Sequence, residues 1–387
     1  MTFRRDLLRA AAAGALLLAV GIAGDARAAD PIKVGTIFPL SGGAGPNGQA
    51  VTDAVKVAAK MINEQGGLLG RQITVVSKDD ESTPAVGVSR ANEMIAEKVD
   101  VVIEGWNSPV TLAMQPVLAR AGVLDITAVS KADPIVSGQG NPYAIRTNSS
   151  NGQDGAILAK YIVETLGAKR IGFLTQNDAY GNGAQQIIEA EMKKLGKPFE
   201  VVVVEQFPFK QTDFRVQLAN VAAANPDAVV AINASESSGM PALIQQYRQA
   251  GIKGTLIGAV GTILPTVFKV AGAALDGVVS ADIYFPDQPP FDSIPENAAF
   301  VKAYKEVHGE IPDKGAALGA LALQVWAKAV AKTNSLDRKT VAEAIRGKTI
   351  EGTLFGTVSF AENGQSQLEH ALFKVTDGTA MKLEMLQ

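Results

Sequence analysis

The sequence predicts an α/β protein made of two doubly wound parallel-sheet lobes with a ligand cleft between them. Short runs rich in β-branched residues alternate with helical patterns, which is typical of βαβ units. The runs are almost continuously apolar, as in parallel strands that helices cover on both faces. The alternation occurs in two series, one before and one after about residue 150, and 387 residues are enough for two such lobes.

The first series predicts an alternation of four strands with helices. The expected strands are Ile32 to Phe38, Ile73 to Val76, Val101 to Ile103 and Val123 to Thr127. The helix between the second and third strands opens with Thr83 as its cap and Pro84 at its first position. Ligand sites of such sheets lie at the carboxyl ends of the strands.

The second series repeats this order and then gives way to a more varied tail. Its expected strands are Ile171 to Leu174, Val201 to Val204, Ala228 to Ile232 and Val278 to Phe285, with a helix from Ala184 after the first. Helices around Phe300, Leu321 and Val341 and strands near Val358 and Phe373 follow. The stretch Ala316 to Val325 contains Gln324 and predicts a buried helix. Such a tail predicts that the chain returns to the first lobe and later re-enters the second.

Residues 1–28 are typical of an export signal. A basic start precedes an apolar run from Ala10 to Ala23, and Ala26-Arg27-Ala28 forms a small-residue cleavage site. The pair Arg4-Arg5 also fits a twin-arginine signal, so two export routes stay open. Because a large core makes disulfides unnecessary, the lack of cysteine is compatible with a periplasmic location.

The composition argues against several classes of function. Lys and Arg number 36 and Asp and Glu number 39, so the net charge of -3 indicates no surface for nucleic acid. The chain has no cysteine and only two histidines, His308 and His370. This argues against thiolate or His-rich metal sites, Cys nucleophiles and most Ser-His-Asp triads. We therefore expect no enzyme, no cofactor and no bound metal.

A series of short motifs resembles one family of binding proteins. The motifs are Ile32-Lys33-Val34-Gly35 with Pro39-Leu40-Ser41-Gly42, Ile62-Asn63 with Gly66 to Gly70, Asp79-Asp80 with Pro84, Gly105 to Pro116, Asn141-Pro142-Tyr143 with Arg146-Thr147, and Asp178-Ala179-Tyr180-Gly181. In this order they resemble the leucine/isoleucine/valine-binding family, the type I periplasmic solute-binding proteins of branched-chain amino acid ABC importers. The resemblance spans essentially the whole chain after residue 28.

The resemblance implies two lobes that close over a small ligand about three hinge crossings. By similarity the crossings fall near residues 150, 283 and 360, so lobe 1 comprises residues 29–150 and 284–360 and lobe 2 comprises residues 151–283 and 361–387. The family does not catalyse. It implies a carrier, expected to be a monomer, that delivers its solute to an inner-membrane permease with separate ATPase subunits.

In lobe 1 the candidate ligand contacts cluster around a helix start. Ser108 is a preferred helix cap and Pro109 suits the first helical position, so a helix should begin there with free N–H groups that suit a carboxylate. The resemblance places the family's carboxylate-binding serine at Ser108 and the cleft wall at Trp106 and Asn107. The family's ligand-contacting threonine falls near Lys131, with Ser130 beside it as a further candidate contact. Lys131 either adds positive charge to the site or is a solvated loop residue. Asn47 replaces an aromatic residue that amino-acid binders often carry.

In lobe 2 the departure from the family is a missing acid. Tyr180 matches the family's cleft tyrosine, and the loop with Ala234 should close over the ligand. The family's acid that pairs with the ligand's ammonium group falls near Val260, where this chain has no carboxylate. Because burying an unpaired ammonium costs several kcal/mol, we expect an aromatic or 2-oxo carboxylic acid as the ligand. Glu236 could supply the acid from another direction, so a hydrophobic amino acid remains open.

Three other interpretations compete with transport. A sensory receptor domain would use the same closure and is distinguished by its signalling partner. The segment Gly43 to Gly48 has the form G-x-G-x-x-G of a dinucleotide site, but Pro46 and the export signal argue against NAD. Asp79-Asp80-Glu81 could hold a hard cation or act as paired acids, although a structural loop is the preferred interpretation.

Overall fold

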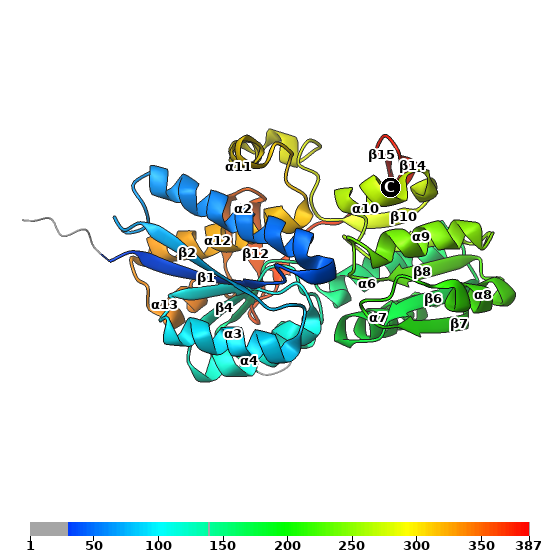
Figure 1. Cartoon of the computed structure of the whole chain (residues 1–387), viewed down its shortest axis with the longest axis horizontal. Coiled ribbons are helices and arrows are strands. Elements are labelled where there is room, and N and C mark those ends of the chain that lie inside the picture. The colour runs from blue at the N-terminus through cyan, green and yellow to red at the C-terminus, as the bar shows by residue number, and fades with distance from the viewer. Residues whose placement is uncertain (1–29, 138–139, 387) are drawn as a thin grey trace, which may run out of the picture.

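Two lobes lie side by side, each a mainly parallel sheet covered by helices on both faces (Figure 1). The computed structural model describes residues 30–137 and 140–386, so the expected export signal at residues 1–28 lies outside the described residues. No helix within those two ranges combines the length and the apolarity that a membrane span requires. The predicted fold class is confirmed.

The sheet of lobe 1 contains five parallel strands in the order β2-β1-β3-β4-β5. They are β1 (Ile32–Phe38), β2 (Ile73–Asp79), β3 (Val101–Glu104), β4 (Leu124–Thr127) and β5 (Ala144–Arg146). On one face lie α2 (Gly45–Glu64) and α12 (Lys314–Thr333), and on the other α3 (Pro84–Ala96) and α4 (Ser108–Arg120), with α5 (Pro134–Ser137) after β4. Val101 and Ile103 pack on the first face and Val102 on the second, which explains the continuously apolar run.

The sheet of lobe 2 has seven strands in the order β15-β14-β10-β9-β8-β6-β7, of which β14 and β15 run antiparallel to their neighbours. The strands are β6 (Arg170–Gln176), β7 (Glu200–Phe207), β8 (Ala228–Ile232), β9 (Thr255–Gly258), β10 (Val279–Asp282), β14 (Ala371–Asp377) and β15 (Lys382–Leu386). One face carries α6 (Asn151–Lys160) and α7 (Ala179–Lys194), and the other α8 (Arg215–Ala224), α9 (Gly239–Gln249) and α10 (Pro265–Ala271).

The chain passes between the lobes after β5, after β10 and before β14. After β10 it returns to lobe 1 as α11 (Pro295–His308), α12, α13 (Arg338–Glu343) and a small antiparallel sheet of β11 (Thr349–Thr353), β12 (Gly356–Phe360) and β13 (Ser366–Gln367). In Figure 1 the orange α12 and α13 therefore lie in the blue lobe, and the red β14 and β15 in the green lobe. The third passage lies later than the expected position near residue 360, because β13 still pairs with β12.

Most expected elements occur, with local differences at their ends. β1 and β8 have the expected bounds, and the stretch Ala316 to Val325 lies within α12. β10 ends at Asp282, three residues before the expected end, because the chain leaves the sheet there. α7 begins at Ala179 and not at Ala184, because Asp178 Oδ1 accepts the N–H groups of Tyr180 and Gly181, both at 3.0 Å.

The glycine motif near residue 45 has a packing role. Gly48 lies inside α2, and a Cβ at this position would collide with the carbonyl oxygen of Pro39. The residue therefore lets α2 approach the turn that follows β1, which accounts for the glycine without a dinucleotide.

Candidate ligand-binding cleft

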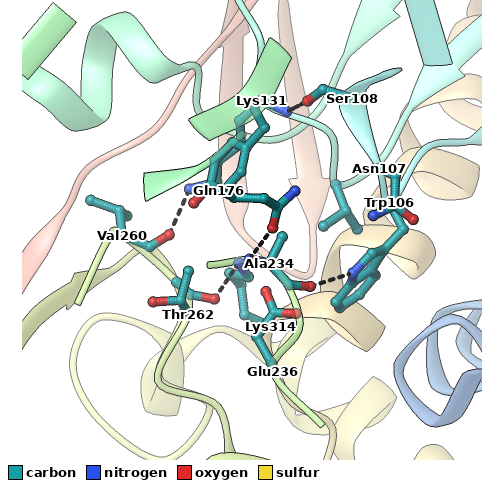
Figure 2. Close-up of a pocket in the computed structure, with 13 residues that line it drawn as sticks. Trp106, Asn107, Ser108, Lys131, Gln176, Ala234, Glu236, Val260, Thr262 and Lys314 are labelled. Carbon is teal, nitrogen blue, oxygen red and sulfur yellow. Dashed lines mark hydrogen bonds between the residues drawn. The ribbon is translucent and has the colours of Figure 1, made fainter. Parts of the chain in front are cut away.

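A cleft with about 380 Å³ of empty space lies between the carboxyl ends of the strands of the two lobes. The lining residues are Trp106, Asn107, Ser108, Val129, Lys131 and Lys314 from lobe 1, and Gln176, Tyr180, Ala234, Glu236, Val260, Gly261 and Thr262 from lobe 2. In Figure 2, Ser108 and Lys131 lie toward one end of the cleft and Glu236 and Lys314 toward the other.

The structure brings seven of the ten predicted site residues together at this cleft. They are Trp106, Asn107, Ser108, Lys131, Tyr180, Ala234 and Val260. Asn47 is buried within α2, and Pro109 lies in the first turn of α4, but neither lines the cleft. Ser130 does not line it either, because its hydroxyl lies 2.9 Å from Thr111 Oγ1 within lobe 1.

The start of α4 presents donor and acceptor groups to the cleft. The helix begins at Ser108 with Asn107 as its cap residue, one position earlier than expected. Ser108 Oγ accepts the N–H groups of Lys131 and Ala132 at 3.2 and 3.1 Å. A serine hydroxyl has two acceptor positions and one proton, so its O–H can still donate to a ligand oxygen. Asn107 Oδ1 is buried and has no hydrogen-bond partner in the described part of the chain.

Lys131 is neither a solvated loop residue nor a free positive charge. It is only 5% exposed, and its Nζ lies 2.5 Å from Asp154 Oδ2 of α6 and donates to the Val260 carbonyl oxygen at 3.0 Å. His370 Nε2 lies 2.8 Å from the other oxygen of Asp154. Burial alone would raise the pKa of Asp154, but the charge of Lys131 and the hydrogen bond to His370 lower this pKa to about 2. The charge of Lys131 is therefore balanced within the protein, across the two lobes.

Lys314 is a second buried cation, and it is not among the residues that the sequence motifs predict. It is 5% exposed, and its Nζ donates to the Gly261 carbonyl oxygen at 2.9 Å. Among residues 30–137 and 140–386, no carboxylate oxygen lies within 4.0 Å of this ammonium group. Lys314 is the first residue of α12, where a positive charge opposes the helix dipole. A lysine at the first position of an apolar helix is therefore a sequence feature that indicates a role other than helix stabilisation.

Glu236 presents an uncharged acid to the cleft. The residue is 5% exposed, and burial raises the pKa of its carboxyl group to about 8, although the positive charge of Lys314 opposes this shift. At pH 7 the group is therefore mostly protonated. Its Oε2 is buried and has no partner among the residues that the structure describes. In this state Glu236 lacks the negative charge that would pair with an ammonium group.

Gln176 and two aromatic side chains complete the walls. Gln176, at the end of β6, donates to Asp178 Oδ2 and accepts the N–H of Ala234 at 3.0 Å, which holds the loop after β8. Trp106 Nε1 donates to the Ala234 carbonyl oxygen at 3.3 Å, and Tyr180 lies buried in the first turn of α7. Gln176 and Thr262 had no distinctive sequence signal beyond their places after strands.

The acidic loop after β2 has a structural role in the fold. Asp79 Oδ1 accepts the N–H groups of Leu40 and Glu81, both at 2.8 Å, and Asp80 Oδ1 accepts that of Ser82 at 2.7 Å. No group of three or more potential metal-ligand side chains occurs in the part of the chain that the structure describes.

Comparisons with known proteins agree with this architecture. Residues 31–380 match the family model described as periplasmic binding protein. Leu/Ile/Val-binding protein homolog 1 of Brucella suis biovar 1 (strain 1330) is 27% identical over 375 residues, which cover 97% of this chain and 98% of the relative.

Three solved structures share the fold over nearly their whole length. The leucine-binding protein LivK of Thermotoga maritima MSB8 has a TM-score of 0.81 at 25% identity, covering 92% of this chain and 98% of that one. A solute-binding protein of an ABC transporter from R. palustris, in complex with benzoate, has a TM-score of 0.81 at 26% identity, covering 92% and 96%. Another from Rhodopseudomonas palustris BisB5, in complex with 3,4-dihydroxy benzoic acid, has a TM-score of 0.78 at 26% identity, covering 89% and 93%. With two doubly wound lobes, a cleft at their strand ends and a family match over almost all described residues, the chain belongs to the periplasmic binding protein family, as a type I protein of the branched-chain amino acid type.

Proposed function

We propose that the protein captures a carboxylate-bearing solute with an apolar body, an aromatic or 2-oxo carboxylic acid, for an ABC importer. The role in an ABC importer follows from the family, whose members are the extracytoplasmic solute-binding components of ABC transporters. Its partners would then be an inner-membrane permease and the ATPase subunits that drive it. The proposed class of solute depends on the charges of the cleft.

The balance of charges in the cleft is the observation that carries this proposal. Lys131 is paired with Asp154, whereas Lys314 has no carboxylate within 4.0 Å in the described residues and Glu236 is mostly protonated at pH 7. The carboxyl groups of Asp282 and Asp313 interact with the charge of Lys314 only from beyond 4.0 Å. Buried charges are normally paired in direct contact, so a ligand carboxylate would supply the contact partner that Lys314 lacks. An ammonium group of a ligand would instead lie near the positive charge of Lys314. The resemblance predicts an acid at the position of Val260, and valine cannot pair with an ammonium group.

The apolar body of the solute is supported by the walls and by two relatives. Trp106 and Tyr180 offer aromatic faces against which a ring can pack. The two Rhodopseudomonas proteins, each 26% identical to this chain, are in complex with benzoate and with 3,4-dihydroxy benzoic acid. These aromatic carboxylates have the chemistry that the cleft charges favour.

A hydrophobic amino acid is the second candidate ligand. It is favoured by Glu236, whose Oε2 faces no partner among the described residues and could lose its proton to pair with an ammonium group. The LivK relative, 25% identical, is a leucine-binding protein. The two candidates differ in the charge state that Glu236 adopts in the complex.

Calorimetric titration at pH 7 tests the proposal. The panel is benzoate, 4-hydroxybenzoate, phenylpyruvate, leucine and phenylalanine, with benzamide as the uncharged counterpart of benzoate. We expect at least one of the organic acids to bind while leucine and benzamide give no binding heat. Tight leucine binding with silent organic acids would overturn the proposal.

A further inference from the structure

A buried series of hydroxyl groups that ends on a carboxyl group lies next to the lobe 1 side of the cleft. Glu104, the last residue of β3, is fully buried. Thr111 Oγ1 donates to its Oε2 and Thr127 Oγ1 to its Oε1, both at 2.7 Å. Ser130 Oγ lies 2.9 Å from Thr111 Oγ1. We call these four residues the Glu104 network.

The Glu104 network connects the two segments that form the lobe 1 wall. Glu104 and Thr111 flank the segment 105–108, which supplies the lining residues Trp106 to Ser108. Thr127 and Ser130 belong to the end of β4 and the loop that supplies Val129 and Lys131. Backbone bonds join the same segments, because the N–H groups of residues 129 and 130 donate to the Gly105 carbonyl oxygen at 3.0 and 2.9 Å.

Gly105 provides the space that this network needs. Its φ of +96° is in the region that favours glycine. A Cβ at this position would lie 2.8 Å from Thr111 Oγ1 and 3.1 Å from Ser130 Oγ. A larger residue at position 105 would therefore push the hydroxyl groups of Thr111 and Ser130 away from each other or away from segment 105–108.

Burial of the Glu104 network has an energetic cost. A buried carboxyl group is expensive, and well-packed apolar residues of similar volume are often as stable as a buried polar group. A fully bonded polar network, however, specifies one arrangement of the segments that it joins. Ser108 Oγ, which accepts from Lys131 and Ala132, spans the same two segments at the cleft surface.

We propose that Glu104 is a positioning residue for ligand recognition. By accepting from Thr111 and Thr127 it holds segment 105–108 against the loop after β4, and thereby sets the positions of the Trp106 ring and the Ser108 hydroxyl. This inference goes beyond the proposed function and does not depend on which solute the cleft takes.

The position of Trp106 can be measured without any ligand. The chain has two tryptophans, and Trp326 is buried in α12, so a Trp326→Phe background leaves Trp106 as the only tryptophan, which can be excited selectively over the tyrosines. Trp106 is 5% exposed, and acrylamide should therefore quench it poorly. In this background we expect Glu104→Leu and Thr111→Val to raise the quenching constant about twofold or more well below the melting temperature, because the wall segments open locally.

Asp80→Asn is the matched control. Asp80 is also a buried acid of lobe 1, and its charge acts on Glu104, but its hydrogen bond is to the N–H of Ser82 and not to the wall segments, so it separates the effect of charge from that of the hydrogen bonds. We expect this variant to change the melting temperature and to leave the quenching of Trp106 as in the parent. Unchanged quenching in Thr111→Val, or an equal rise in Asp80→Asn, would overturn the inference. If Glu104→Leu fails to fold, Thr111→Val alone decides. The outcome is independent of the ligand titrations, so failure of the organic-acid proposal is distinguishable.

Discussion

The two lobes contribute different kinds of groups to the contacts across the cleft. In three of these contacts lobe 1 supplies a side-chain donor and lobe 2 a backbone acceptor. Trp106, Lys131 and Lys314 donate to the carbonyl oxygens of residues 234, 260 and 261 at 3.3, 3.0 and 2.9 Å. Substitution of Lys131 or Lys314 in lobe 1 therefore removes a hydrogen bond between the lobes together with a positive charge. Substitutions in lobe 2 leave these acceptors in place and change mainly the shape and charge that the ligand meets.

Asp154 of lobe 2 departs from this division because its side chain accepts from Lys131, and its removal should have the largest effect. Asp154→Asn leaves the buried Lys131 without its counter-charge, and such a change costs about 3–5 kcal/mol. We expect urea denaturation to show a loss of this size in the free energy of unfolding. The double variant Lys131→Met, Asp154→Leu should recover most of it, because an apolar pair replaces the ion pair. If Asp154→Asn is as stable as the parent, Lys131 and Asp154 do not form an ion pair in the folded protein.

Lys314→Met should have the next largest effect, this time on the ligand. We expect the affinity for benzoate to fall about 10- to 150-fold, because a charge-assisted contact contributes about 1.5–3 kcal/mol. Calorimetry with Lys332→Met, an exposed lysine of the same helix, is the control and should match the parent. Equal losses in both variants would mean that long-range charge, and not the cleft contact, governs affinity.

Val260→Glu tests the division from the side of lobe 2. The new carboxylate would supply the acid that the resemblance predicts here, and we expect it to lower the affinity for benzoate about tenfold while raising that for leucine. Titration of both ligands against the variant and against Val260→Gln separates charge from size. If both ligands lose affinity equally, the position does not select between ligand classes.

Ser108→Ala should have an effect of similar size that is shared by all carboxylate ligands. A hydroxyl donor to a charged carboxylate contributes about 1.5 kcal/mol at the low end of the range, which is about tenfold in the dissociation constant. Benzoate, phenylpyruvate and leucine titrations should show similar factors for this variant. A loss confined to one ligand would place the carboxylate elsewhere in the cleft.

The pH dependence of benzoate affinity should be the smallest effect near neutrality. Burial raises the pKa of Glu236 to about 8, so the group loses its proton as the pH rises from 7 to 9 and becomes negative. An anionic ligand favours the protonated form, so its affinity should fall over this range and binding should take up protons. In Glu236→Gln the affinity should stay level from pH 7 to 9, and a decline as in the parent would assign the titration to another group.

The elements of the fold were predictable because each depends on local pattern. The apolar runs of β1 and β8 and the apolar helix α12 need only their own residues, and both lobes followed from their repetition. The third passage between lobes was placed too early because β13 is two residues long and depends on pairing with β12. Such a short strand has no periodicity of its own.

The site was predictable where it follows strand ends and less so where distant segments meet. Ser130 and Lys131 are neighbours, yet one belongs to the Glu104 network and the other lines the cleft, and no spacing distinguishes them. Lys131 pairs with Asp154 across the hinge, and Lys314 reaches the cleft because α12 packs on α2. Both contacts depend on tertiary packing that the sequence pattern does not contain.

The three bonds from lobe 1 side chains to lobe 2 carbonyl groups involve no atom of the solute. A permease that separates the lobes must break these same bonds whichever solute is enclosed. Part of the work of unloading is therefore constant for every cargo, and only the remainder depends on how much more tightly that cargo binds the closed form. A transporter served by this protein would therefore spend the same part of that work on chemically different solutes.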